Sequence, residues 1–153
     1  MKKFKFTLQT VHNVREMKQE REEMTLAEII MEVNRATERI AQIEKMRLEA
    51  VEKYTQRLRA GEVLNATEME LNAKYFNSLD GLQREAEKLL SEKNLACTAQ
   101  RVKLAGAARE VKITDRLREH QYLRHQLEAD KQQQINLDEI VSAGYARKMR
   151  NKL

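Results

Sequence analysis

The side chains that could support catalysis or metal binding are few in this sequence. It contains three histidines, His12, His120 and His125, and a single cysteine, Cys97. Two histidines that hold one metal ion from a helix are typically four residues apart, whereas His120 and His125 are five apart and face different ways. The sequence also lacks a cysteine and histidine cluster with zinc spacing and a glycine-rich phosphate loop. We therefore expect no catalytic residue, no cofactor and no metal site, and interpret the chain as non-enzymatic.

The net charge of +5 comes from the two ends of the sequence. Lysine or arginine occupies three of residues 1–5 and four of residues 147–153, and neither segment contains an acidic residue. A concentrated basic end can steer a protein toward an acidic partner. Because these residues match no recognisable nucleic-acid-binding motif, we expect a protein partner and no nucleic acid.

Neither a membrane span nor a secretory signal is predicted. No stretch approaches the roughly 20 apolar residues that cross a bilayer, and after FKFTLQTV charged residues resume, unlike in a signal peptide. The one cysteine excludes an intramolecular disulfide, and Cys97, within LACTAQ, fits a small apolar helix position. A reducing cytoplasm is compatible with this cysteine content.

The composition predicts long helices as the elements that position these charges. Charged residues make up 35% of the chain, against about 25% in typical domains, and proline, which breaks helix interiors, is absent. Gly61 is placed to end one helix, and Asn65 with Glu68 forms a capping box that begins another. We expect one all-α domain over 1–153, with helices at about 8–60 and 66–148 and a turn at about 61–65.

Apolar residues in both helices recur at the spacing of a coiled-coil seam. The spacing after Ile43 departs from the heptad, which predicts local unwinding of the supercoil, and NSLDG at 77–81 either kinks the second helix or delays its coiled part. The predicted seam of the first helix is Ile29, Val33, Ala36, Ile40, Ile43, Met46, Ala50, Tyr54 and Leu58. The predicted stripe of the second is Leu79, Leu82, Ala86 and Leu89, followed by Ile113, Leu117, His120, Arg124 and Leu127.

A short loop between two long helices makes them antiparallel neighbours. With the fold near residue 63, Ile30 lies near Ala96, and Leu8 lies near Leu117 or Arg118. The sequence thus predicts a long antiparallel two-helix coiled-coil hairpin with a C-terminal overhang beyond about residue 118, which frays when free. The alternating Phe4, Phe6 and Leu8 are interpreted as the segment leading into the first helix, since no second strand is predicted to pair with them.

Three stretches together resemble the flagellar export protein family known as FliJ. They are FKFTLQTVHNVREMKQEREE at the start, KYTQRLRAGEVLNATEMELNAKYFNSLDGLQREAEKLL around the turn, and INLDEIVSAGYARKM near the end. They cover nearly the whole chain, in the family's order and with matching length. The resemblance implies a cytoplasmic, non-enzymatic component of the flagellar type III export apparatus, peripheral at the cytoplasmic face of the inner membrane through its partners.

The resemblance also implies partners and sites. FliJ-like proteins bind the hexameric export ATPase (FliI-like) in the manner of a rotary-ATPase central stalk, the export gate protein (FlhA-like) and export chaperones. The site that the resemblance implies for the ATPase ring comprises Phe4, Phe6, Leu8, Arg147, Lys148, Arg150 and Lys152. The site that it implies for the gate comprises Tyr54, Leu58, Tyr75, Leu79 and Leu82, although Arg47 and Ala50 depart there from the family's apolar and aromatic pattern.

Two other functions are compatible with the same coiled-coil sequence pattern. The seams also suit a self-associating coiled-coil scaffold, which would be an obligate dimer, whereas we expect the export protein to be monomeric alone. The equivalent stalk of a virulence injectisome is the other alternative, and genome neighbourhood would separate it from the flagellar system.

Overall fold

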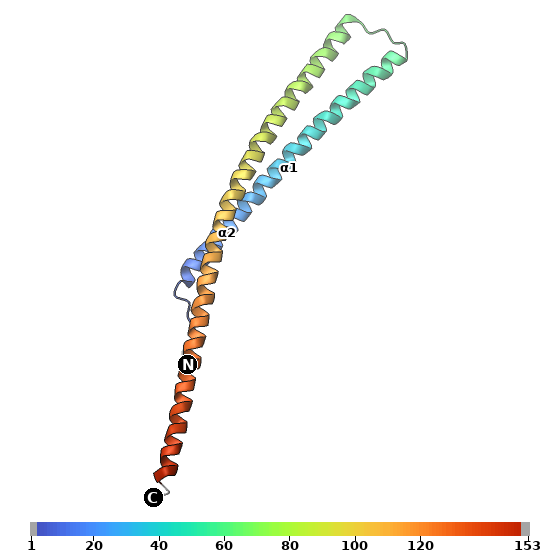
Figure 1. Cartoon of the computed structure of the whole chain (residues 1–153). Coiled ribbons are helices and arrows are strands. Elements are labelled where there is room, and N and C mark those ends of the chain that lie inside the picture. Colours follow the sequence, from blue (N-terminus) through green and yellow to red (C-terminus); the bar gives the residue numbers. More distant parts are fainter. Residues whose placement is uncertain (1–2, 151–153) are drawn as a thin grey trace. The chain divides into compact units, whose positions relative to one another are not determined.

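The computed structural model describes residues 3–150 and is built from two helices (Figure 1). Helix α1 spans Gln9–Arg59 and helix α2 spans Ala66–Arg150, and no strand occurs within residues 3–150. The two helices pack against each other as an antiparallel hairpin, which confirms the predicted fold class. Residues 77–81 lie within α2 without interruption.

The loop begins at a glycine, as the sequence predicts. Gly61 has a φ of +77°, a left-handed conformation that glycine adopts without a side-chain penalty. Its backbone N–H donates to the Leu58 carbonyl oxygen at 3.1 Å, and the N–H of Glu62 donates to the Arg57 carbonyl oxygen at 3.2 Å. This pair of bonds is a Schellman motif, which satisfies the last carbonyl groups of α1.

The predicted capping box begins α2. The backbone N–H of Glu68 donates to the Asn65 side-chain oxygen at 2.8 Å, and the Glu68 carboxylate accepts from the Asn65 N–H at 3.3 Å. Both bonds satisfy N–H groups that have no partner inside the helix. The loop is therefore fixed at both ends by local chemistry.

The structure divides into two compact units, Met1–Gln19 with Gly106–Leu153, here the terminal unit, and Glu20–Ala105, here the loop unit. Each contains part of both helices. In the loop unit, Glu22 accepts a hydrogen bond from Gln100, and Glu32 pairs with Lys93. In the terminal unit, His12 contacts Thr114. These pairs confirm the register predicted from the short loop.

In the loop unit, apolar residues of α1 form a seam that packs on residues of α2. Ile43, Leu79 and Ala86 form a buried cluster, against which Ile40 and Phe76 pack. Burying aliphatic side chains between helices is the main stabilising contribution in such a hairpin. The seam predicted for α1 is buried or half-buried from Ile29 to Tyr54, which confirms it, whereas Leu58 is half-exposed.

The stripe predicted for α2 is wrong at most of its positions. Leu79 and Ala86 are buried, but Leu82 and Leu89 are 37% and 47% exposed, and Ile113, Leu117 and Leu127 are exposed too. His120 and Arg124 are likewise exposed. The inward face of α2 instead keeps one uniform heptad register, and several of its positions hold polar or small residues. The buried or half-buried residues on this face are Phe76, Leu79, Gln83, Ala86, Leu90, Lys93, Cys97, Gln100, Leu104, Ala107, Val111 and Thr114.

The terminal unit has a polar seam around His12 and Thr114, beside the buried apolar residues Phe6, Ala107 and Val111. His12 and Thr114 are 3% and 1% exposed, and the His12 Nδ1 atom lies 2.9 Å from the Thr114 Oγ1 atom. The Thr114 hydroxyl donates to the Val111 carbonyl oxygen at 2.8 Å. The His12 Nε2 atom lies 3.2 Å from the Glu16 carboxylate and 3.6 Å from that of Asp115. A buried histidine thus has polar neighbours on both ring nitrogens.

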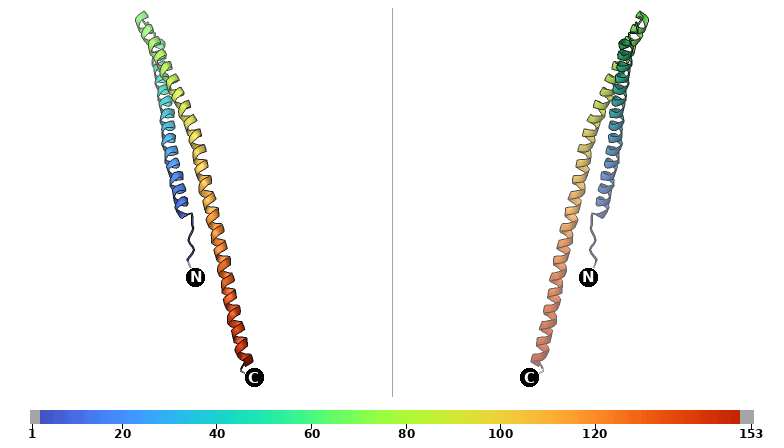
Figure 2. Two further views of the ribbon diagram at one scale, coloured as in Figure 1. Left: turned by 90° about the vertical axis from the view of Figure 1, so that its left-hand side faces the viewer. Right: turned by 90° about the vertical axis from the view of Figure 1, so that its right-hand side faces the viewer.

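The segment before α1 packs on α2 (Figure 2). The Phe4 ring makes edge contacts with Tyr122 and His125, at centroid distances of 5.3 and 5.7 Å. Phe6 is buried and lies edge-on to His12. Because an extended chain covers more than twice the length per residue of a helix, this segment covers α2 to about residue 125. The overhang therefore begins later than the predicted residue 118, and all residues from 131 to 150 are exposed.

Candidate protein-binding surfaces

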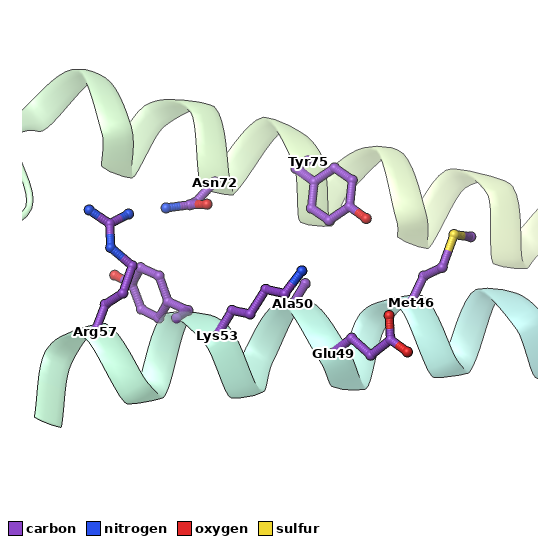
Figure 3. Close-up of a pocket in the computed structure, with 8 residues that line it drawn as sticks. Met46, Glu49, Ala50, Lys53, Arg57, Asn72 and Tyr75 are labelled. Atoms are coloured by element: carbon purple, nitrogen blue, oxygen red, sulfur yellow. The ribbon is translucent and has the colours of Figure 1, made fainter. Parts of the chain in front are cut away.

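A groove opens between the two helices of the loop unit, close to the loop (Figure 3). Its volume is about 390 Å³. α1 and α2 both contribute to its walls, and the two tyrosines come from opposite helices. The lining residues are Met46, Glu49, Ala50, Lys53, Tyr54, Arg57, Asn72 and Tyr75.

Residue size and seam spacing account for this groove. Past Ile43, the inward residues of α1 follow at steps of three, four and four, which turns the α1 seam away from the uniform heptad register of α2. The inward positions there are Ala50 on α1 and Asn72 on α2, a methyl group and an amide. Neither fills the space that the large side chains Ile43 and Phe76 fill in the neighbouring layer.

The charged side chains at the rim are mostly neutralised. Arg57 Nε donates to the Glu62 carboxylate at 2.6 Å, and an Arg57 terminal nitrogen donates to the Glu68 carboxylate at 3.3 Å. These bonds raise the pKa of the Arg57 guanidinium above its ordinary value, the Glu62 bond most and the Glu68 bond next. Arg57 therefore stays charged and joins the end of α1 to the start of α2.

The residues predicted for gate binding lie at different depths. Tyr54 and Tyr75 line the groove from opposite sides, and Leu82 is exposed on α2. Leu79 is 3% exposed and belongs to the core cluster, so it supports this surface from beneath. Leu58 is half-exposed and does not line the groove.

The residues predicted for ATPase binding fall into two places on the terminal unit. Phe4 contacts Tyr122 and His125 of α2, Phe6 is buried beside His12, and Leu8 is partly exposed. Arg147, Lys148 and Arg150 are exposed at the end of α2. From His125 to Arg147 the helix rises about 33 Å, at about 1.5 Å per residue. The apolar and the basic parts of the predicted ATPase site are therefore separate, and Lys152 lies outside the described residues.

Sequence reasoning missed four groove residues, Glu49, Lys53, Arg57 and Asn72. Periodicity identifies apolar seams, and a lysine or an asparagine at a groove gives no such pattern. The apolar periodicity also placed Leu82 and Leu89 in the core. The uniform heptad from Asn72 to Thr114, followed through its polar members, could have revealed that these leucines lie outside the seam.

The described residues contain no group of histidine, cysteine, aspartate or glutamate side chains that could hold a metal ion. Cys97 is buried in the α2 seam, where it packs as a small apolar side chain. Within residues 3–150, neither helix has an apolar stretch of the length that a membrane crossing requires.

The family comparison agrees with the two-helix architecture. The family model described as Flagellar FliJ protein matches residues 4–150. Neither a curated protein nor a solved structure matches the chain. Since the match covers nearly the full sequence and includes both helices and the loop, the chain belongs to the flagellar FliJ protein family and is a component of flagellar type III protein export.

Proposed function

We propose that this protein is a non-enzymatic adaptor that binds the hexameric export ATPase like a rotary-ATPase stalk and links it to the export gate and export chaperones. The observation that carries the proposal is the end of α2. Residues 131–150 are helical and exposed on every side, and they include the apolar Leu137, Val141 and Tyr145. Exposed apolar residues on one helix favour a protein-binding role.

The spacing of these side chains supports insertion into a ring. Leu137, Val141 and Tyr145 are four residues apart, so they follow one face of the helix. The basic residues Arg147, Lys148 and Arg150 come directly after them. An apolar stripe ending in positive charge suits a channel with an apolar wall and an acidic mouth. Phe4, Phe6 and Leu8 would add contacts with the ring before the exposed segment 131–150 begins, and Lys152 would add to the basic end.

The test is binding to the cognate export ATPase and stimulation of its ATP turnover. A Val141→Glu variant should bind the ring at least about tenfold more weakly, because it places a charge in an apolar contact. Removal of residues 147–153 should weaken binding and reduce its salt dependence. Gln134→Glu, at an exposed position of the same helix, serves as the control and should bind like the wild type. Unchanged ATPase activity at saturating wild-type protein would exclude the proposal.

For the gate, we propose a surface formed by Tyr54, Tyr75 and Leu82, supported by the buried Leu79 and bordered by Leu58. The large exposed aromatic and leucine side chains favour this role, because such residues anchor protein interfaces. Leu82→Ala should weaken binding of the gate's cytoplasmic domain, measured by calorimetry. Equal affinity of the variant and the wild type would count against the surface.

Attachment to the gate would place the protein at the cytoplasmic face of the inner membrane without a membrane span of its own. Export chaperones would be further partners, with no site assigned. Sedimentation equilibrium separates this proposal from a self-associating scaffold. A monomer is expected for the adaptor, and a concentration-independent dimer would favour the scaffold.

A further inference from the structure

The groove of the loop unit combines an apolar floor with one unneutralised cation. Met46, Ala50 and Tyr54 from α1 and Tyr75 from α2 provide the apolar contacts. Of the charged lining residues, Arg57 pairs with two glutamates and Glu49 pairs with Lys45 at 4.0 Å. Lys53 has no acidic partner within residues 3–150. In Figure 3 its side chain runs along α1 toward Ala50.

An exposed apolar stripe continues this groove along α2. Tyr75, Leu82 and Leu89 are each seven residues apart, so they lie on one side of the helix. They are 45%, 37% and 47% exposed, although they adjoin buried seam positions. Over two heptads the stripe is about 21 Å long, at about 1.5 Å per residue. A groove followed by a straight apolar stripe matches the apolar face of one amphipathic helix.

We infer that this surface binds an amphipathic helical segment that inserts a large apolar side chain beside Ala50 and places a carboxylate against Lys53. The identity of the partner as the export gate rests on the function proposed above. The charge pattern selects an acidic segment, because Lys53 is the groove cation without an internal counter-ion among the described residues. The small Ala50 leaves the volume that the inserted side chain occupies.

Three substitutions in the full-length chain test this inference against the gate's cytoplasmic domain by calorimetry. Ala50→Leu fills the groove, Lys53→Glu reverses its charge, and Leu89→Ala shortens the stripe. Each should raise the Kd at least about fivefold, as for residues central to an interface. The ratio of the Lys53→Glu Kd to the wild-type Kd should fall as NaCl rises from about 0.05 to about 0.5 M, because salt screens exposed charges.

Each variant has a matched control on an outward face of the same unit. Ala41→Leu, Lys88→Glu and Leu95→Ala make the same chemical changes at exposed positions, and these should leave the Kd within about twofold of wild type. Far-ultraviolet circular dichroism checks that all six variants keep the wild-type helix content.

The outcomes separate this inference from the proposed gate docking. If Leu82→Ala weakens gate binding while Ala50→Leu, Lys53→Glu and Leu89→Ala bind like wild type, the gate docks here but the groove inference is wrong. If the wild-type chain does not bind the gate at all, both are wrong. If the three variants instead change self-association measured by sedimentation, the occupant is a second copy of this chain, which overturns the inference.

Discussion

The two units use the same pair of helices but join them with different chemistry. In the loop unit, aliphatic residues such as Ile43 and Leu79 pack against each other. In the terminal unit, the inward positions of α1 are His12, Arg15 and Gln19, while Val11 and Val14 next to them are exposed. An apolar seam stabilises by burial, which is strong and non-directional. A polar seam adds little net stability but accepts only geometries that satisfy its hydrogen bonds.

This difference assigns separate roles to the two seams. Among the described residues, every buried side-chain nitrogen and oxygen has a hydrogen-bond partner, so the polar seam is satisfied in its present register. Polar residues at inward coiled-coil positions are known to fix register at a cost in stability. We infer that the loop unit holds the helices together and that the terminal unit aligns them. Local opening should therefore be easiest in the terminal unit.

The largest expected effect comes from the apolar seam. Ile43 is 1% exposed at the centre of the core cluster, so Ile43→Ala should lower the free energy of unfolding by about 2–4 kcal/mol through lost burial and the cavity left behind. Urea unfolding followed by circular dichroism measures this. The control Ile113→Ala, at a half-exposed position of the terminal unit, should change it by less than about 1 kcal/mol. Equal losses would remove the distinction between the seams.

The next effect tests the polar seam. Thr114→Val keeps the side-chain shape but removes the hydroxyl beside the His12 Nδ1 atom, leaving a buried polar atom unsatisfied at a cost of about 1–2 kcal/mol. Hydrogen exchange of the amides of residues 9–19 should report this loss. The double variant His12→Leu with Thr114→Val should recover most of it, because both polar partners are then absent. Additive losses in the double variant would contradict a coupled pair.

A pair of glycine substitutions compares the loop with the helix. Gly61 has a positive φ, so Gly61→Ala should cost about 1 kcal/mol of unfolding free energy. Gly81 lies within α2, with open space where a Cβ would be added, so Gly81→Ala should stabilise by about 0.5–1 kcal/mol. Thermal unfolding would show opposite shifts of the midpoint. A stabilising Gly61→Ala would mean that the loop does not constrain the hairpin.

The smallest effect concerns the ion pairs that flank the polar seam. Lys18 and Glu110 lie 3.4 Å apart in the terminal unit, and both side chains are about half-exposed. Exposed pairs contribute little, so Lys18→Ala should change the free energy of unfolding by less than about 0.5 kcal/mol. Repeating the urea titration at 0.5 M NaCl should remove even this difference. A loss as large as that of Thr114→Val would show that surface charge, and not the buried pair, aligns the terminal unit.

The sequence predicted the helices and the loop because these depend on local chemistry. The absence of proline, Gly61 and the Asn65–Glu68 capping box act within a few residues, so their effects follow from composition and spacing. The α1 seam was predictable for the same reason, since isoleucine and valine recur there at heptad intervals. The register of the hairpin followed from the short loop.

The α2 seam and the groove do not follow from the spacing of apolar residues alone. Leu82 and Leu89 match an apolar stripe better than the inward residues Gln83 and Leu90 do. Only the helix packed opposite decides which face of α2 turns inward. The burial of His12 depends on Thr114 and Asp115, about a hundred residues away along the chain.

By itself, the sequence determined the two helices, their boundaries and their antiparallel pairing, because backbone capping and loop length are local constraints. Tertiary structure alone decided which side chains became core and which remained available for partners. It put Leu79 into the core, left Leu82 and Leu89 exposed, and opened a groove between Ala50 and Asn72. The physical reason is that a side chain becomes buried only where another element packs against it. The sequence of one helix does not specify which element that is.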